Sequence, residues 1–351
     1  MKKTLFFVSA MAAMLFASCQ KEADQAVDTI TATFTIQAPV VLGTKAVTSA
    51  DQTTIGDGRA ADNLVFAVFD ETGTELTELR KGDWKNNIGD DQTKITFSND
   101  AQPTATVNVT LVRGKNYSFV CWAQNEAATC YNFADMKNIG ISYTDYNASN
   151  NDLRDAFYAY AETNGVVTEN FSQTITLKRP FAQINAGTTD FTEAKKAGLE
   201  IDNLYTTMTV KNAATVLETF TGKATTPAEV TFAYAHAVAP DYKLVIDKTK
   251  LVNTPQVTVA DEYGWLAMNY ILVADGSNIG TDSALATVSV EIREGEGTNS
   301  TVLTSYSIDN VPVQRNYRTN LVGSLLTAEG TISVLIDPIF EGEYVTVVPQ
   351  N

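Results

Sequence analysis

Few residues in this sequence have the types and spacing that catalysis needs. His236 is the only histidine, and no Cys-x-x-Cys pair accompanies it, so a typical zinc site lacks ligands. A Ser-His-Asp triad would have to use the same histidine, yet the sequence holds no Gly-x-Ser-x-Gly elbow. Gly295 and Gly297 are not followed by Gly-Lys or by a helix pattern, so they do not form a phosphate loop. The sequence therefore predicts no catalytic residue, no cofactor and no metal ligand.

Paired carboxylates are the remaining groups that could act on a substrate. A glycosidase needs two of them at a fixed separation in a cleft. The pairs in this sequence are Asp90-Asp91, Glu294 with Glu296, and Glu341 with Glu343. All of them lie in turn-like sequence, where charges are usually solvated. We therefore expect no hydrolase.

The clearest chemistry is a lipid attachment at Cys19. Two lysines precede an apolar run, Leu5 to Ala17, which is too short to span a bilayer as a helix. Small residues then lead directly into the cysteine, which is the layout of a cleaved export signal. Phe16 occupies the position, three residues before the cysteine, where lipoprotein signals usually carry leucine. The alternative is an ordinary signal peptide that is cleaved near Ser18 without lipid attachment. We predict that residues 1–18 are the signal and that Cys19 becomes the lipidated N-terminus.

The charge balance argues against a nucleic-acid partner. The chain has 25 basic and 41 acidic residues, a net charge of −16. Removing the signal removes two lysines and no acids, so the mature balance is 23 − 41 = −18. Binding to phosphates needs a basic stripe, which such a chain does not offer.

Two further cysteines, Cys121 and Cys130, leave two alternatives open. An exported protein meets an oxidising environment, which permits a disulfide between them. However, Cys121 falls in a strand-like run on the same face as Tyr117 and Phe119, which is the usual place for a buried free cysteine. Spacing alone does not decide between these alternatives.

The segment behind the signal predicts a tether and then a strand with one buried face. Residues 20–28 are polar and acidic, as in flexible tethers. From residue 29 on, apolar residues alternate strictly with threonines, which is the period of a half-buried strand. Its apolar face consists of Ile30, Ala32, Phe34 and Ile36. A long polar connection follows, about residues 43–63, and it carries Lys45 and Arg59.

The rest of the chain predicts an all-β, mainly antiparallel fold with few short helices. Many short strand candidates are separated by turns, and no helix alternates regularly with them. Helices are predicted only over 189–197 and 150–160. The polar stretch 162–171 is the best boundary, which gives domains at 46–172 and 173–351 behind the segment 19–45. Near the C-terminus two stretches alternate like strands, one with Ile332, Val334 and Ile336 and the other with Val345 and Val347. Both are candidate donor strands, which could enter the groove left in another copy if the first strand were removed. The alternative is that both strands belong permanently to the second domain.

Several motifs together resemble the fimbrillin-like lipoproteins of the Bacteroidetes, the type V pilin group. The resemblance covers nearly all of the mature chain, and the shared order of the motifs is more specific than any one of them. The motifs are Gln20–Glu22 after the lipidated cysteine, Leu64–Phe69, Phe119–Gln124, Asn151–Tyr158, Leu177–Asn185, Ala267–Tyr270 and Val311–Asn320.

This resemblance implies an architecture and a function. The fold would be two tandem transthyretin-like β-sandwich domains. The protein would reach the cell surface as an outer-membrane lipoprotein, be cut after a basic residue (Lys45 first, Arg59 second) and join a fimbrium. Its partners would be other fimbrial subunits, the same or related, with which it exchanges strands. The resemblance also allows a ligand on a host or bacterial surface. The alternative is a surface lipoprotein that binds glycan or host protein without polymerising.

Two of the motifs also have plain structural interpretations. Arg179-Pro180 can mark the place where a strand crosses between sheets, because proline cannot donate to a ladder. Residues 316–320 can be a turn, with Arg315 and Arg318 as solvated charges. We expect structural roles for both motifs.

Overall fold

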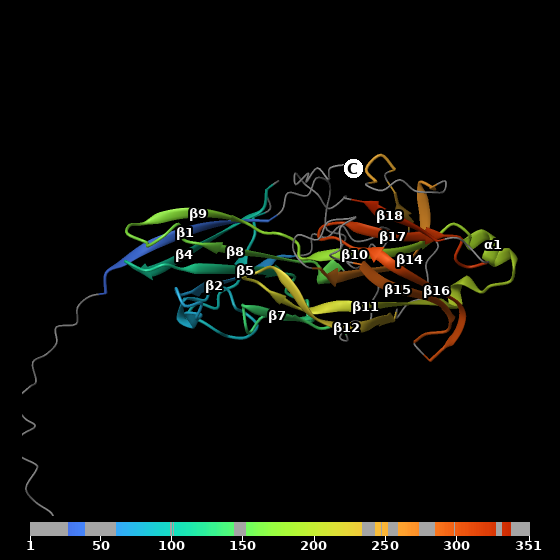
Figure 1. Cartoon of the computed structure of the whole chain (residues 1–351), viewed down its shortest axis with the longest axis horizontal. Coiled ribbons are helices and arrows are strands. Elements are labelled where there is room, and N and C mark those ends of the chain that lie inside the picture. The colour runs from blue at the N-terminus through green and yellow to red at the C-terminus, as the bar shows by residue number, and fades with distance from the viewer. Residues whose placement is uncertain are drawn as a thin grey trace, which may run out of the picture.

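The computed structural model describes residues 27–38, 61–98, 100, 102–143, 152–233, 243–246, 248–251, 259–273, 285–297, 299–327 and 332–337. These residues form an elongated, almost entirely β molecule, with β1 towards one end and α1 at the other (Figure 1). The predicted fold class is confirmed, since nearly all strand pairs are antiparallel.

The strands of the first half are β1 (Thr29–Gln37), β2 (Asn63–Phe69), β3 (Ile95–Thr96), β4 (Thr104–Val112), β5 (Ser118–Gln124), β6 (Tyr131–Asn132), β7 (Asn138–Ile141), β8 (Ala156–Glu162) and β9 (Phe171–Thr176). Those of the second half are β10 (Phe181–Thr188), β11 (Leu204–Glu218), β12 (Lys223–Ala233), β13 (Lys243–Val245), β14 (Glu262–Leu272), β15 (Leu285–Glu294), β16 (Thr301–Pro312), β17 (Arg318–Gly323) and β18 (Ser333–Asp337). The helical elements are α1 (Phe191–Lys196) and short 3₁₀ turns at Thr77–Leu79, Asp152–Arg154 and Ile201–Asn203.

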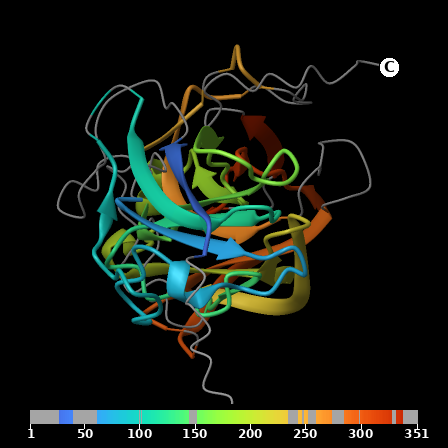
Figure 2. The same ribbon diagram turned by 90° about the vertical axis from the view of Figure 1, so that its left-hand side faces the viewer.

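The first sandwich consists of two facing sheets, seen end-on in Figure 2. One has the strand order β4-β1-β9 and the other β3-β2-β5-β8. Their facing side chains form a separate hydrophobic core that includes Phe34, Phe66 and Phe119. The predicted boundary between residues 172 and 173 falls inside β9, which pairs along β1 and contributes to this core as far as Leu177.

The second half forms one large sheet of eleven strands. Its path is β16-β15-β11-β14-β10-β17-β18, with β12 and β7 on β11, β13 on β14 and β6 on β7. Thus β6 and β7, which come from the first half of the sequence, complete the sheet of the second half, with Val216 opposite Gly140.

The sheet β3-β2-β5-β8 lies between two cores. Every residue of β2 is buried. Alternate residues face opposite ways, so Phe66 belongs to the core of the first sandwich while Val65 belongs to the larger core of the second half. This sheet therefore serves as a middle layer that joins the two halves.

The helix predicted over 189–197 is confirmed as α1, but the helix predicted over 150–160 is wrong. Only Asp152–Arg154 form a helical turn, and β8 begins at Ala156. Tertiary context decides this segment, because β8 pairs with β5 along its whole length and buries Phe157 in one core and Tyr158 in the other.

Candidate functional site

The strand β1 fills a slot between two strands that are distant from it in sequence. It pairs antiparallel with β4 over nine positions, from Thr29 opposite Val112 to Gln37 opposite Thr104. On its other edge it pairs in parallel with β9, from Ala32 opposite Phe171 onwards. Both edges of β1 are thus hydrogen-bonded, and the sheet has no other strand between β4 and β9.

The apolar face predicted for this strand points into the core. The four predicted residues lie inside, Ile30 being 2% exposed and Ala32, Phe34 and Ile36 0% exposed. The threonines between them face outwards, Thr31 being exposed. The alternation of apolar residues and threonines in the sequence therefore matches, residue by residue, the burial of one face of β1.

Phe34 is the centre of an aromatic cluster. Its ring centroid lies 4.5 Å from that of Phe119, 4.9 Å from that of Phe66 and 5.8 Å from that of Phe171. The first two rings come from the middle sheet and the third from β9. Removing β1 would empty this cluster of its central ring, which leaves an aromatic-lined hole.

A small and fully buried residue, Ala32, lies next to this cluster. Ala32 stands between Val109 on β4 and Phe171 on β9, and no part of it is exposed. Close-packed interiors tolerate added carbons poorly, so a larger side chain here would displace its neighbours. Further along, Ile36 lies between Ala105 and Ile175, both buried.

Polar contacts fix the two ends of β1. At its start, the backbone N–H of Thr31 donates to Oδ1 of Asn170 at 2.8 Å, and that of Arg113 donates to the carbonyl of Asp28 at 2.9 Å. At its end, the N–H of Ala38 donates to the carbonyl of Pro103 at 3.0 Å. These contacts hold the two ends of β1 in register with its neighbours.

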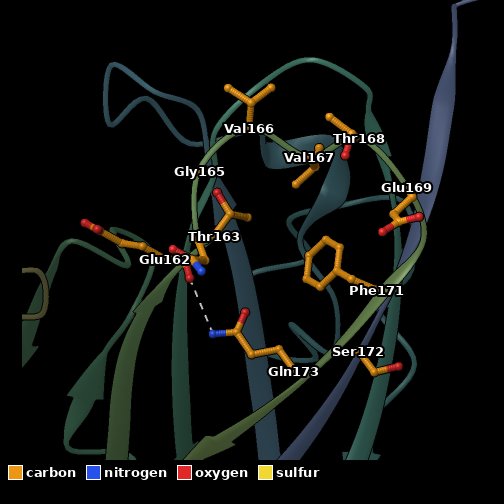
Figure 3. Close-up of a pocket in the computed structure, with 11 residues that line it drawn as sticks. Glu162, Thr163, Gly165, Val166, Val167, Thr168, Glu169, Phe171, Ser172 and Gln173 are labelled. Atoms are coloured by element: carbon orange, nitrogen blue, oxygen red, sulfur yellow. Dashed lines mark hydrogen bonds between the residues drawn. The ribbon is translucent and has the colours of Figure 1, made fainter.

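A cavity of about 400 Å³ adjoins the start of the slot. The loop from β8 into β9 arches over it, with Val167 and Phe171 pointing inwards (Figure 3). Gln173 closes one side by donating to the carbonyl of Glu162 at 3.4 Å. Phe171 therefore lines both this cavity and the aromatic cluster.

Of the two C-terminal stretches, the first forms a strand of the large sheet and the second lies outside the described residues. Residues 333–337 form β18, which pairs antiparallel with β17 at the end of the large sheet. Ile336 is buried there, whereas Ile332 and Val334 are partly buried. Val345 and Val347 lie outside the described residues, as do Cys19, Lys45, Arg59 and His236.

The two cysteines are free and buried, so the disulfide between them is not formed. The physical reason is that they belong to different cores, Cys121 to the first sandwich and Cys130 to the second half. Burial raises the pKa of both thiols, which keeps them protonated and unreactive.

The motifs Asn151–Tyr158, Leu177–Asn185 and Val311–Asn320 meet where the two halves join. Arg179 makes a two-pronged ion pair with Asp155, at 2.6 and 3.0 Å, and also donates to Asn316. Arg315 donates to the hydroxyl of Tyr158 at 2.8 Å and to the carbonyls of Gly222 and Val273.

The prediction of solvated arginines is therefore wrong, and the predicted turn is limited to the start of 316–320, where the N–H of Tyr317 donates to the carbonyl of Gln314 at 3.2 Å and Asn316 has a φ of 65°. Arg315 and Arg318 are each only 9% exposed, and β17 begins at Arg318. The arginines are buried because other segments of the chain cover them, and a single sequence gives no signal of such distant contacts.

Within the described residues, no group of three or more His, Cys, Asp or Glu side chains is placed to hold a metal ion. Among the same residues, no helix has the length and apolar character needed to cross a membrane. The slot holds β1 through main-chain groups on both of its edges and through the buried row of side chains on its inner face.

Comparison with known proteins identifies one family and several related folds. The model of a family of unknown function (DUF6562) matches residues 24–349. No curated protein matches the sequence.

Three solved structures illustrate the related folds. A fimbrial assembly protein from Parabacteroides distasonis is 14% identical, with a TM-score of 0.43, and the match covers 88% of this chain and 95% of that one. The tip fimbrial protein Mfa3 from Porphyromonas gingivalis is 11% identical, with a TM-score of 0.42 and coverages of 88% and 99%. A candidate polysaccharide-binding protein from Bacteroides thetaiotaomicron is 12% identical, with a TM-score of 0.43 and coverages of 86% and 95%. With TM-scores below 0.5, these likenesses leave the function to be argued from this chain's own residues and contacts.

Proposed function

The chain belongs to a family of unknown function (DUF6562), and we propose that this member is a structural subunit of a cell-surface fimbria that assembles by exchanging strands. The observation that carries the proposal is β1. It is an N-terminal strand in the middle of a sheet, its whole apolar face is buried, and its neighbours β4 and β9 come from elsewhere in the sequence.

Proteolysis behind β1 would turn this strand into a removable part. We place the cut after Lys45, with Arg59 as the second choice, in a polar connection of the kind that proteases reach. The released piece, residues 19–45, would carry away the lipidated Cys19, β1 and the anchor to the outer membrane. The remainder, residues 46–351, would then stand with an empty slot.

An empty slot would bind another strand strongly. The facing edges of β4 and β9 would expose unpaired N–H and C=O groups, which template an incoming strand. Burying four side chains in place of Ile30, Ala32, Phe34 and Ile36 would contribute a gross gain of roughly 5–10 kcal/mol, before the costs of association. Because the donor strand and the slot are different parts of a subunit, the contact is head-to-tail and builds a filament.

The experiment is to compare the surface protein with variants that cannot be cut. Wild-type protein should show a mature N-terminus after residue 45 or 59 by mass spectrometry, and it should migrate as a ladder of high-mass species. The double variant Lys45→Ala with Arg59→Ala should keep its lipidated N-terminus and give no ladder. A lipidated N-terminus at Cys19 in every wild-type fraction, without a ladder, would instead support the non-polymerising lipoprotein.

A further inference from the structure

The cavity of about 400 Å³ under the β8–β9 loop has features of its own, apart from the slot. We propose that it binds the terminal sugar ring of a neutral glycan. This binding does not depend on strand exchange, because the cavity is formed in the uncut chain with β1 in place.

The cavity lies at the edge of the first sandwich, between its two sheets. β8 is the last strand of one sheet, and β9 is the last strand of the other. The loop that connects them, residues 163–170, arches over the space between the two strands (Figure 3). Most residues of this loop are exposed, so a ligand reaches the cavity from solvent.

Backbone hydrogen bonds hold the loop in this shape. The N–H of Gly114 donates to the carbonyl of Val167 at 2.8 Å, and the N–H of Val167 donates to the carbonyl of Lys115 at 2.9 Å. At the start of the loop, the N–H of Thr163 donates to the carbonyl of Tyr117 at 2.9 Å. The cavity is therefore formed before a ligand arrives, which spares the complex the entropic cost of ordering the loop.

An aromatic ring forms the floor of the cavity. Phe171 is partly buried, and its ring stands at 89° to that of Phe34, with the two centroids 5.8 Å apart. Val167, which is 6% exposed, lies beside it (Figure 3). The face of an aromatic ring is negative and attracts the weakly positive C–H groups on the flat side of a sugar ring. The contact with Phe34 fixes the orientation of this ring for stacking.

Hydrogen-bond donors and acceptors surround this aromatic floor. Thr163 lies on one side of the ring, and Thr168 and Glu169 lie on the other (Figure 3). The hydroxyl oxygen of Thr163 accepts a backbone hydrogen bond at 3.1 Å, so its own proton can be donated to a ligand. The side-chain amide of Gln173 donates to the carbonyl of Glu162 at 3.4 Å, which leaves the amide oxygen to accept.

These groups favour a neutral ligand over an ion. Among the described residues that line the cavity, none is Lys, Arg or His, so an anion would meet only the negative charge of Glu169. The carboxylate of Glu162 is turned away, since it accepts from the hydroxyl of Tyr160 (Figure 3). A cation would therefore meet a single carboxylate and could not use the hydroxyl donors. A sugar ring has hydroxyl groups that both donate and accept, together with an apolar face.

The size of the cavity suits one sugar ring better than a long chain. Ligand pockets in proteins span about 300–1,000 Å³, and this cavity is at the lower end of that range. Asn164 and Val166, at the top of the loop, are exposed, so further sugar units would extend past them into solvent. A contact limited to one ring predicts a Kd on the order of 1 mM.

The first test measures binding to the uncut protein by saturation-transfer NMR. The probes are the methyl glycosides of glucose, galactose, mannose and N-acetylglucosamine, with choline as a cation and acetate as an anion. At least one glycoside should bind with a Kd on the order of 1 mM. Choline and acetate should show no transfer. Binding of none of the glycosides, or of choline or acetate in their place, would overturn the proposal.

The second test locates the bound sugar with matched variants. Glu169→Gln should weaken binding about tenfold or more, because it removes the charge from a hydrogen-bond acceptor of the ligand. Glu162→Gln removes the same charge from a carboxylate that faces away, so it is the control and should bind like wild type. Phe171→Leu should also weaken binding, because it removes the flat ring.

Urea midpoints check that each variant is folded. Glu169 is exposed, so Glu169→Gln should keep the wild-type midpoint and decides the outcome even if Phe171→Leu does not fold. Unchanged binding in Glu169→Gln, or equal weakening in both glutamine variants, would contradict the assignment of the sugar to this cavity.

Sugar binding and fimbrial assembly can fail separately. The double variant Lys45→Ala with Arg59→Ala, which keeps β1, should bind the glycoside as tightly as wild type. If a glycoside binds and the wild type forms no ladder, the sugar site stands and the proposed function fails. If the wild type forms its ladder and no glycoside binds, the proposed function stands and the sugar site is wrong.

Discussion

Replacing Phe34 by alanine should destabilise the first sandwich more than any other single truncation in β1. The side chain is 0% exposed and its ring contacts three others at centroid distances of 4.5 to 5.8 Å. A buried Phe→Ala change costs about 3–5 kcal/mol, as transfer free energy of the lost ring plus the cavity left behind. Collapse of the site is limited here, because Phe66 and Phe119 are held by the ladder of the middle sheet.

The assay is urea unfolding of uncut protein, followed by the fluorescence of its three tryptophans, Trp84, Trp122 and Trp265. Phe34→Ala should lower the free energy of unfolding by the stated amount, and Thr31→Val, on the exposed face of the same strand, should change it by less than about 0.5 kcal/mol. Equal effects of the two variants would mean that β1 is not a core strand, and both the slot and the proposals built on it would fall.

Three further outcomes follow from other contacts. Asp155→Ala should lower the free energy of unfolding by about 3–5 kcal/mol in urea unfolding, because it leaves the buried Arg179 guanidinium without its ion-pair partner. Burial raises the pKa of Asp190, but hydrogen bonds from the side chains and backbone of the residues around it outweigh burial, so its pKa lies below the usual 3.8. The Asp190 carboxylate therefore stabilises the fold above about pH 4, and this stabilisation is lost as the pH falls through its folded-state pKa. The urea midpoint of wild type should exceed that of Asp190→Asn by more at pH 7 than at pH 3. Cys121 and Cys130 should resist a thiol reagent until the protein is unfolded, and reduction should leave the mass of the protein unchanged.

The face of β1 could be predicted because its signal is local. Strict alternation of Ile30, Ala32, Phe34 and Ile36 with threonines fixes both the strand and its buried side, whatever lies next to it. Its neighbours could not be predicted. Pairing with β4 joins residues 67 to 83 positions apart, and pairing with β9 is parallel, so no hairpin or turn signal in the sequence indicates either neighbour.

The errors fall where distant contacts override local pattern. β8 mixes alanine with aromatic residues and therefore resembles a short helix, yet the edge of β5 selects the extended form. β17 begins with Arg-Thr-Asn, which resembles a turn, but those polar residues are buried beside β10. The ion pair of Arg179 with Asp155 and its contact with Asn316 span up to 137 positions, so only the fold brings them together.

The two-sided burial of the middle sheet explains how the chain could lose a central strand and survive. A sandwich that gives up β1 exposes the core side of β2 and β5, including Phe66 and Phe119. The same strands hold Val65 and Trp122 in the core of the second half, which β1 does not contact. Arg315 and Arg179 connect the two halves of the molecule through buried hydrogen bonds. The sheet β3-β2-β5-β8 is therefore anchored from behind. Under the proposed function its front face would open when β1 leaves, and a sheet held rigid in this way could receive a donor strand without refolding.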